Sequence, residues 1–319
     1  MGVRSSTGRG IEVRANGLFR ECFTVPNRKR IEKAVIPAAG LGTRMLPATK
    51  AVPKELLPVA GKPLIQYAVE EAAASGIQTV IVVVRQDNCL IQRHFAEDHE
   101  LESILNQRRL GESANMVRSL AKLAKLQFVR QEKPLGLAHA ISCARPLLDE
   151  EPFAILLPDV IMLSREPVVS QLIRAHQKIG GSVVAIRDVP RQDVQRFGVV
   201  DVERTTMSKA KRSVRLKGLV EKPSPDKAPS GLGIFGRYLL EPSIWNAIAR
   251  SNPDVKGEVQ LTDALNLLCL DRPVFGVCFD GRHYDAGDRM GYLKANVELS
   301  LEDSCLAQPL HDYFAGVFR

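Results

Sequence analysis

The chain has 319 residues, of which 45% are hydrophobic and 25% charged, and its formal net charge is +8. This length and composition are typical of a soluble α/β enzyme with an elaborated edge, and no run approaches the ~18 apolar residues that a membrane span needs. The six cysteines form no CxxC pair, which excludes a small disulfide-stapled secreted fold and predicts free thiols in the cytoplasm.

Residues 1–30 carry most of the positive charge. Seven Lys or Arg residues stand there against Glu12 and Glu21, so the segment holds +5 and leaves only +3 for residues 31–319. It has neither periodicity nor an apolar core of the kind a secretory signal needs, and we expect a basic, disordered extension. An organellar transit peptide stays an alternative. The body is only mildly basic, which suits a pocket for a small anionic ligand and gives no strong indication of a nucleic-acid partner.

From residue 31 onward, short apolar runs alternate with segments of helical spacing. The runs predict buried strands at 33–37, 79–84, 127–130 and 153–157. The segments between them predict helices at 63–75, 88–95, 100–126 and 137–144. Strands that are apolar throughout and alternate with helices indicate a Rossmann-like, mostly parallel sheet flanked by helices. Such sheets bind ligands beyond the carboxyl ends of their strands.

The pattern changes after about residue 180. Further strands are expected at 182–186, 198–202, 214–220 and 233–238, with short or charged connections. They predict an added mixed-sheet part, so we divide the chain into a first part at 31–180, a second part at 181–300 and a C-terminal tail at 301–319. The basic segment 204–217 is expected to include a solvated hairpin loop.

A glycine-bearing loop follows the first strand directly. It reads Ala38-Ala-Gly-Leu-Gly-Thr-Arg44, and Gly40 and Gly42 let main-chain N–H groups approach an anion closely. Arg44 adds a fixed fork of donors that suits phosphate. Ten residues further on, Lys54 lies on a proline-flanked, rigid path that can return toward the loop. The spacing is neither a Walker loop nor a GxGxxG fingerprint, and an ordinary βα turn stays the alternative.

The longer sequence around this loop is specific. Residues 40–58 read Gly-Leu-Gly-Thr-Arg-Met-Leu-Pro-Ala-Thr-Lys-Ala-Val-Pro-Lys-Glu-Leu-Leu-Pro, and residues 61–67 read Gly-Lys-Pro-Leu-Ile-Gln-Tyr. They resemble the signature of nucleotidyltransferases that make nucleoside diphosphate sugars, and most of all that of bacterial UTP–glucose-1-phosphate uridylyltransferases. The likeness runs from about residue 33 to about residue 297, nearly the whole chain outside the extension and the tail.

This resemblance implies the nucleotide-diphospho-sugar transferase fold, with the nucleotide on the first part and the sugar on the second. It implies that Arg44 and Lys54 are catalytic. The nucleotide-binding positions of the loop would be Ala39, Gly40, Leu41, Gly42, Thr43 and Glu55. The family also implies a homo-oligomer, either a dimer or a tetramer.

A candidate base site follows the strand at 127–130. The amide of Gln131 offers a donor and an acceptor together, which matches the edge of a pyrimidine. In the family, a Gln here and a backbone Gly in the next turn read the base, and they match Gln131 and Gly136. The family usually shows Gly-Leu-Gly-His, whereas this chain has Ala138 at the second glycine, a small change. His139 is expected to be a helix-start histidine with a structural hydrogen bond.

Two aspartates are candidate ligands for Mg²⁺. Asp159 follows the apolar strand at 153–157, where an α/β sheet places catalytic groups, and Mg²⁺ commonly takes one or two carboxylates with phosphate oxygens and water. The family pattern Asp-Cys-Gly is close to Asp285-Ala-Gly, so Asp285 is the second candidate. Asp288 is adjacent and stays an alternative, and a lone Asp after a strand is otherwise a turn or cap residue.

The resemblance places the sugar 1-phosphate in the second part. Glu221 and Lys222 match the family's sugar and phosphate contacts, and Gly198 matches a glycine that lets the backbone approach the sugar. Successive strand residues point to opposite faces, so the chain must bend near Pro223 if both side chains reach one ligand. The motif Gly257-Glu-Val-Gln-Leu-Thr-Asp263 is expected to brace the pocket rather than to do chemistry.

The reaction implied by the resemblance joins UTP and glucose 1-phosphate into UDP-glucose and pyrophosphate with Mg²⁺ as cofactor. Catalysis would depend on cations that offset the repulsion between two anionic reactants, supplied by Arg44, Lys54, Lys222 and the metal at Asp159. Three alternatives stay open: a related transferase that uses dTTP or another nucleotide, a different sugar such as galactose 1-phosphate, and an inactive regulatory paralogue. No nucleic-acid or membrane partner is expected.

Overall fold

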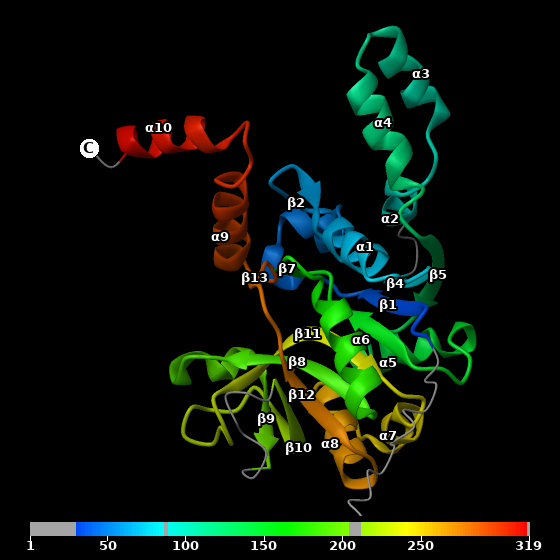
Figure 1. Ribbon diagram of the computed structural model, residues 1–319, viewed down its shortest axis with the longest axis vertical. Coiled ribbons are helices and arrows are strands. Elements are labelled where there is room, and N and C mark those ends of the chain that lie inside the picture. Colours follow the sequence, from blue (N-terminus) through cyan, green and yellow to red (C-terminus); the bar gives the residue numbers. More distant parts are fainter. Residues whose placement is uncertain (1–29, 86–88, 204–211, 318–319) are drawn as a thin grey trace, which may run out of the picture.

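The computed structural model describes residues 30–85, 89–203 and 212–317. Its central feature is a nine-stranded sheet with the order β5-β4-β1-β6-β11-β8-β12-β10-β9, drawn in Figure 1. The strands of this sheet are β1 Lys33–Ala38, β4 Thr79–Arg85, β5 Lys125–Gln131, β6 Phe153–Leu156, β8 Ser182–Asp188, β9 Gly198–Val202, β10 Ser213–Glu221, β11 Leu232–Leu240 and β12 Val274–Cys278.

The first part of the sheet is parallel and the second is mixed. Strands β5, β4, β1 and β6 run parallel to one another, as the apolar runs predicted. Strand β11 is antiparallel to both β6 and β8, β12 is parallel to β8, and β10 and β9 complete the antiparallel edge. The predicted fold class is therefore confirmed, and both parts share one continuous sheet.

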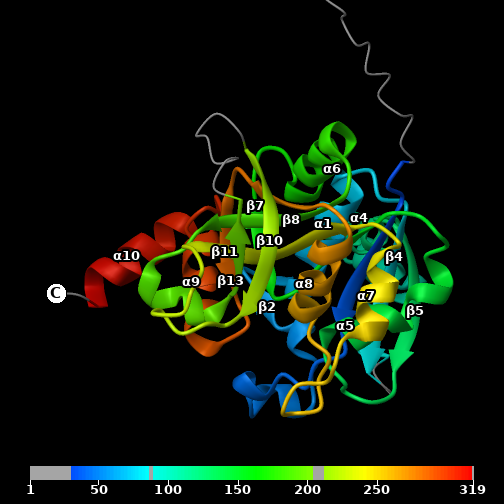
Figure 2. The ribbon, with the colours of Figure 1, turned by 90° about the horizontal axis from the view of Figure 1, so that it is seen from below.

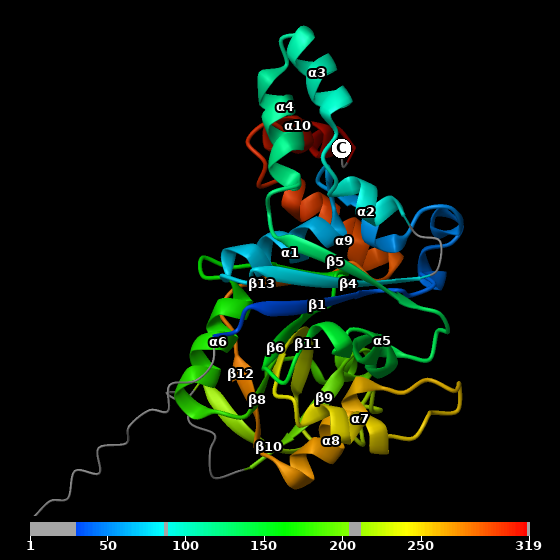
Figure 3. The ribbon, with the colours of Figure 1, turned by 90° about the vertical axis from the view of Figure 1, so that its right-hand side faces the viewer.

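The helices are α1 Leu64–Ala74, α2 Leu90–His94, α3 His99–Gln107, α4 Gly111–Leu120, α5 Leu137–Cys143, α6 Val168–Ile179, α7 Ile244–Arg250, α8 Leu261–Asp271, α9 Arg289–Ser300 and α10 Ala307–Val317. Helices α1, α2 and α6 cover one face of the sheet and α5, α7 and α8 cover the other, whereas α3, α4 and α10 extend away from it (Figure 1). Figure 3 shows α1 and α2 on one side of β1, β4 and β5, with α5 on the other. Figure 2 shows α7 and α8 side by side near β10.

Alternation along the strands supplies the two cores. In β1, Ala34, Ile36 and Ala38 pack in one cluster with α1, α2 and α6, whereas Val35 packs in the other with α5, α7 and α8. Strand β1 therefore buries both of its faces, as expected for the central part of a sheet covered on both sides, whereas the edge-side strand β10 alternates buried and exposed residues.

A third, smaller cluster lies beyond the carboxyl ends of the parallel strands. It joins α9 to two short strand pairs, which are β2 Pro58–Val59 with β3 Lys62–Pro63 and β7 Val160–Leu163 with β13 Arg282–Asp285. Ile161 and Tyr284 are buried in this cluster. The pairing of β7 with β13 brings the segment after Asp159 beside Asp285, although the two are far apart in the chain.

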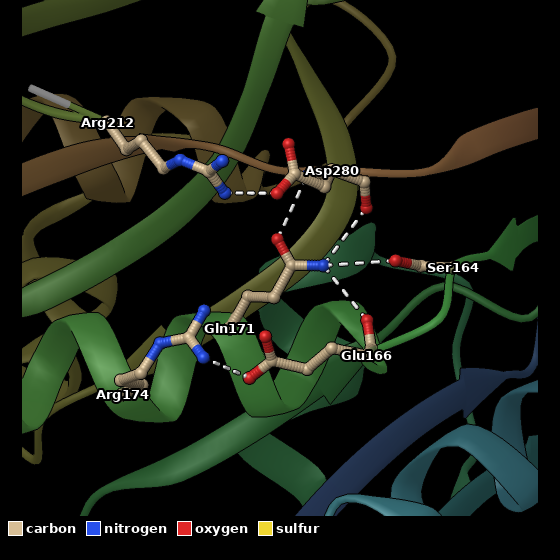
Figure 4. A network of polar contacts seen from close by, with 6 residues as sticks. All are labelled: Ser164, Glu166, Gln171, Arg174, Arg212 and Asp280. Atoms are coloured by element: carbon tan, nitrogen blue, oxygen red, sulfur yellow. Dashed lines mark hydrogen bonds and ion pairs between the residues drawn. The ribbon is translucent and has the colours of Figure 1, made fainter. Parts of the chain in front are cut away.

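A polar network fixes the connection that leads into β13 (Figure 4). The amide of Gln171, on α6, donates to the backbone oxygens of Glu166 and Asp280 at 2.9 and 3.0 Å and to Ser164 Oγ at 3.2 Å. Its Oε1 atom accepts from the Asp280 N–H at 2.9 Å. Arg212 pairs with the Asp280 carboxylate. Helix α6 therefore anchors the chain just before the strand that carries Asp285.

Two sequence predictions need correction or qualification. The single helix expected at 100–126 is wrong: α3 ends before a turn in which Arg109 has φ 61°, α4 follows, and β5 already begins at Lys125. The segment 301–319, expected as a tail, contains α10. The extension at 1–29 and the loop residues 204–211 lie outside the described residues. Within the described residues, no helix is both long and apolar enough to cross a bilayer.

Candidate active site

The loop after β1 lines a cavity of about 380 Å³, which we call the loop cavity. The structure brings together there every nucleotide-binding residue that the sequence predicted, with Lys54 and Asp159 beside them. The predicted residues that line it are Ala39, Gly40, Leu41, Gly42, Thr43, Lys54, Glu55, Gln131, Gly136 and Asp159. The cavity lies past the carboxyl ends of the parallel strands, as expected for such a sheet.

Close packing inside the loop explains the glycine at position 42. Gly42 has φ 62°, and an added Cβ would lie 3.1 Å from Thr49 Cγ2 and 3.3 Å from Lys54 Cβ. The Thr49 hydroxyl donates to the Gly42 carbonyl oxygen at 2.8 Å, which fixes the turn from the other side. The loop therefore requires glycine both for its backbone conformation and for its contact with the lysine.

An ion pair connects Lys54 to Asp159. Lys54 begins the 3₁₀ turn η3 (Lys54–Leu56), and its Nζ lies 2.7 Å from Asp159 Oδ2. Burial raises the pKa of Asp159, but the charge and hydrogen bond of Lys54, together with Arg44, bring it below its usual value. Burial likewise lowers the pKa of Lys54, and Asp159 and Glu55 more than offset this. Both groups are therefore charged at neutral pH.

Glu55 is the unusual member of this group. Its side chain is 1% exposed, its two oxygens have no hydrogen-bond partner among the described residues, and its Oε1 lies 4.0 Å from Lys54 Nζ. Burial raises its pKa to about 7, against the opposing effect of Lys54. A buried carboxyl that is half protonated near neutral pH costs stability when it ionises.

This gives a pH-dependent prediction for Glu55→Gln. Below pH 4.5, the pKa of Glu55 in the unfolded chain, its carboxyl is neutral in both the folded and the unfolded state. Between pH 4.5 and about 7 the carboxyl ionises only in the unfolded state. The free energy of unfolding therefore falls as the pH rises through this range. Glutamine cannot ionise, so we expect the variant to gain about 3 kcal/mol over wild type between about pH 4 and pH 8. Melting curves across this range measure it, and a constant difference at every pH would contradict the prediction.

The end of β5 and the start of α5 form the predicted base site. Gln131 Nε2 donates to the Gly136 carbonyl oxygen at 3.1 Å and lies 2.9 Å from His139 Nδ1. Gly136 has φ 95°, and an added Cβ would lie 2.6 Å from the Val259 carbonyl oxygen. The Ala138 N–H donates to that same oxygen at 3.1 Å. The structural role expected for His139 is confirmed, and the amide of Gln131 is held with its Oε1 atom left as an acceptor.

The predicted sugar-contacting residues line a second cavity of about 210 Å³, which we call the Glu221 cavity. Glu221 Oε2 accepts from Thr262 Oγ1 at 2.6 Å, and its Oε1 pairs with Lys222. Lys222 has φ 44°, so the predicted bend is present and places both side chains in contact. A Cβ on Gly198 would lie 3.2 Å from Thr262 Oγ1 and 3.3 Å from Glu221 Oε2, which explains that glycine.

The two cavities meet at Asp159, which lines both. Around this point three charged groups face Gly287, where a Cβ would lie 3.0 Å from Asp159 Oδ2, 3.0 Å from Asp285 Oδ1 and 3.2 Å from Arg44 Nη2. The Ala286 N–H donates to the Asp159 carbonyl oxygen at 2.8 Å, which ties the two aspartate segments together. The structure therefore brings the predicted arginine and both predicted aspartates to one place.

Asp285 is better placed than Asp288 to contact a ligand here. Asp285 lines the Glu221 cavity, whereas Asp288 caps α9 by accepting from the Gly291 N–H at 2.8 Å. Arg196 Nη2 lies 3.1 Å from Asp285 Oδ2 and 2.8 Å from Asp288 Oδ2. Asp288 is therefore a helix-capping residue, one of the two roles that the sequence allowed for it, and its carboxylate also pairs with Arg196.

The donor set suits a hard divalent cation that shares its coordination with a substrate. Asp159 and Asp285 offer two carboxylates, and the described residues contain no group of three or more His, Cys, Asp or Glu side chains arranged to hold a metal. Mg²⁺ is bound in this way by one or two carboxylates together with phosphate oxygens and water. The residues present therefore fit such an ion.

Sequence reasoning missed three residues of this site. Arg196 and Gly287 were not singled out, and Thr262 was placed only within a bracing motif. That motif does brace the site, because Val259 contacts Gly136 and Thr262 holds Glu221. The sequence offered only one indication that Arg196 belongs to the site: it lies two residues before Gly198, which was predicted to contact the sugar.

Comparison with known proteins gives a consistent result. The family profile for nucleotidyl transferases matches residues 33–302. A UTP–glucose-1-phosphate uridylyltransferase of Bacillus subtilis (strain 168) is 40% identical over 292 residues, which cover 92% of this chain and 97% of the relative. A UTP–glucose-1-phosphate uridylyltransferase from Staphylococcus haemolyticus (strain JCSC1435) is 42% identical over 275 residues, which cover 86% of this chain and 94% of the relative.

Solved structures agree with these relatives. A UTP-bound UDP-glucose pyrophosphorylase from Acinetobacter baumannii superposes with a TM-score of 0.82 at 34% identity, covering 90% of this chain and 99% of that one. A UDP-glucose pyrophosphorylase complexed with UDP-glucose gives a TM-score of 0.77 at 34% identity, and the match covers 86% of this chain and 100% of that one. The chain therefore belongs to the nucleotidyl transferase family and, within it, to the UTP–glucose-1-phosphate uridylyltransferases.

Proposed function

We propose that the loop cavity takes UTP, that the Glu221 cavity takes glucose 1-phosphate, and that the two react beside Asp159. The observation that carries this proposal is the junction of the cavities at Asp159, with Arg44 and Lys54 at the same place. This assignment follows the division into a nucleotide part at 31–180 and a sugar part at 181–300. Names of relatives that bind UTP and UDP-glucose support it.

The reaction needs alignment and charge more than acid–base groups. An oxygen of the sugar phosphate attacks the α-phosphorus of UTP, a new P–O bond forms, and the bond to the oxygen that bridges to the β-phosphorus breaks. The nucleophile is already an anion, so no proton has to be removed. The groups that matter are those that hold two anionic reactants in line and offset their repulsion.

The chain supplies cations on both sides of the reacting phosphorus. Arg44 and the loop N–H groups would contact the triphosphate, Lys54 would hold it beside Asp159, and Lys222 would contact the sugar phosphate. Mg²⁺ bound by Asp159 and Asp285 would supply further positive charge to the phosphate oxygens. These charges act in partly buried surroundings, since the side chains of Lys54 and Asp159 are 18% and 15% exposed.

Selection of uracil would come from Gln131. Its amide nitrogen is engaged by Gly136 and His139, which leaves Oε1 to accept from the N3–H of uracil. Cytosine has no N–H at that position in its neutral form, so it would leave the Gln131 oxygen unpaired. Glu221 and Thr262, which both line the Glu221 cavity, would contact sugar hydroxyl groups, and Gly198 lets the backbone pack closely against them.

Initial rates of pyrophosphate release test this function. UTP with glucose 1-phosphate should give the highest kcat/KM in a panel that includes dTTP, CTP, ATP and GTP against glucose, galactose and mannose 1-phosphates. A preference for CTP or a purine nucleotide would contradict the Gln131 assignment. A preference for dTTP or for another sugar 1-phosphate would show that the assigned substrate is wrong and that the assigned reaction type is right. No release with any pair would indicate the inactive paralogue.

The homo-oligomer, a dimer or a tetramer, and the cytoplasmic location stay predictions. The first is measured directly by size-exclusion chromatography with light scattering on the full chain.

A further inference from the structure

Arg237 is a fully buried arginine next to the candidate active site that the proposed chemistry does not use. Its side chain is 0% exposed, on β11. The register between β11 and β8 shifts between Ile234 and Tyr238, and Gly236 there has φ 61°. Such irregularities bend a strand and redirect a side chain, and they are common beside active sites. Here the irregular segment places Arg237 under the turn that carries Asp159.

The guanidinium group donates four hydrogen bonds, three of them to backbone carbonyl oxygens, and forms an ion pair with Glu71. Nη1 donates to the carbonyl oxygens of Leu157 and Gly236 at 2.9 and 3.1 Å, and Nη2 donates to that of Val160 at 2.8 Å. The Nε and Nη2 atoms lie 2.9 and 2.8 Å from the Glu71 carboxylate. Arg237 therefore holds the carbonyl groups on both sides of Pro158-Asp159.

Glu71 connects this clamp to the opposite layer. Its other oxygen accepts from the Val169 N–H at 3.1 Å, in the first turn of α6, while Glu71 itself lies on α1. The Leu157 N–H donates to the Gly236 carbonyl oxygen at 2.9 Å. The turn is thus fixed to β11 and, through Arg237 and Glu71, to two helices that pack on the sheet.

We propose that Arg237 is a positioning residue that, backed by Glu71, sets the location of the Asp159 carboxylate for binding Mg²⁺. The inference rests on the proposed role of Asp159. Arg237 itself does not line either cavity, so it acts through the backbone of residues 157–160. The planar group is needed because a lysine ammonium has only three donors and cannot span both carbonyl groups and the carboxylate. Groups behind metal ligands typically change metal affinity or activity by about 10–100-fold.

The first test is Arg237→Lys. We expect the Mg²⁺ concentration for half-maximal activity to rise about tenfold or more, with turnover at saturating Mg²⁺ reduced by about 10–100-fold. A second readout needs no turnover: calorimetric titration of UTP without glucose 1-phosphate, with and without Mg²⁺. The gain in UTP affinity that Mg²⁺ gives should shrink about tenfold in the variant.

A second variant separates positioning from stability. In Glu71→Met/Arg237→Met both charges of the buried pair are removed, which often leaves stability little changed or improved. We expect this variant to fold, to need the same higher Mg²⁺ concentration for half-maximal activity, and to show the same smaller gain in UTP affinity on adding Mg²⁺. The control is Leu172→Ala, a fully buried core residue on α6, which should lower the melting temperature without moving either Mg²⁺ readout.

Hydrogen exchange on the wild-type enzyme tests, without any variant, whether the turn that Arg237 holds is rigid, because the Leu157 and Val160 N–H groups donate to Gly236 and Leu157 there. The Leu157 and Val160 amides should exchange as slowly as those of β6 in the absence of metal and nucleotide. Fast exchange there, with β6 protected, would overturn the inference even if both variants failed to fold. Wild-type Mg²⁺ dependence in both folded variants would also overturn it.

Asp159→Asn distinguishes this failure from failure of the proposed metal site. If Asp159→Asn keeps its activity and its Mg²⁺ dependence, the proposed metal site is wrong. If Asp159→Asn loses activity while the Arg237 variants keep wild-type Mg²⁺ dependence, only the positioning role is wrong.

Discussion

Replacing Asp159 by asparagine is expected to lower turnover by about 10²–10³-fold, the size of losing one preorganised charge contact at a reacting phosphate. Asparagine keeps the shape of the side chain and removes its charge, so the proposed metal ligand is weakened while the turn stays in place. The variant should fold, although Lys54 loses its ionic partner and the melting temperature should fall. Asp285→Asn should do less at saturating Mg²⁺ and should raise the Mg²⁺ concentration for half-maximal activity.

A Mg²⁺ titration of pyrophosphate release, with circular dichroism to confirm the fold, measures both effects. The matched control is Asp149→Asn, which removes the carboxylate of another Lys–Asp pair, with Lys33, far more exposed than Asp159. An Asp159→Asn enzyme with wild-type rate and wild-type Mg²⁺ dependence would mean that the metal is held elsewhere, or by the substrate phosphates alone.

Removing either cation of the loop cavity is expected to lower turnover by roughly 10²-fold or more. The two variants should differ in stability. Arg44 is exposed, so Arg44→Ala should leave the melting temperature nearly unchanged. Lys54→Ala leaves Asp159 as a largely buried carboxylate with only the charge of Arg44 to offset its burial, so it should destabilise the fold and raise the pKa of Asp159.

Activity and melting curves for Arg44→Ala, Lys54→Ala and the control Lys33→Ala distinguish these effects. Lys33→Ala removes a lysine of comparable exposure from an ion pair outside both cavities and should keep wild-type turnover. Near wild-type turnover in both loop variants would remove Arg44 and Lys54 from the catalytic assignment.

Much of this site was predictable because its key residues follow directly on strands. The loop after β1, Gln131 at the end of β5 and Asp159 after β6 all lie at the same edge of a parallel sheet, and strand order alone brings them together. The apolar runs that mark those strands are strong local signals. The fold class and the nucleotide-binding loop therefore follow from short stretches of sequence.

The residues that were missed depend on contacts between distant segments. Arg196 lies 3.1 Å from Asp285, which is 89 residues further along the chain, and nothing near Arg237 in the sequence reveals that its side chain turns inward at an irregular strand segment. The division of 100–126 into two helices had one weak signal, Gly111, because the turn is made by Arg109 at positive φ. Helix propensity predicts a continuous helix where tertiary packing requires a reversal.

The pairing of β13 with β7 has a consequence for how the protein is made. The segment that carries Asp159 leaves the ribosome long before the segment that carries Asp285 and Gly287, and β12, which lies inside the sheet between β8 and β10, is also synthesised late. The four parallel strands are synthesised first, so they are the first part of the sheet that is available to associate. The proposed set of catalytic charges, however, is complete only when residues 282–288 close over Asp159 and bring Asp285 beside Arg44 and Asp159. A nascent chain released before that point would contain the nucleotide loop without the completed centre, so translation must pass this stretch before any catalytic activity can arise.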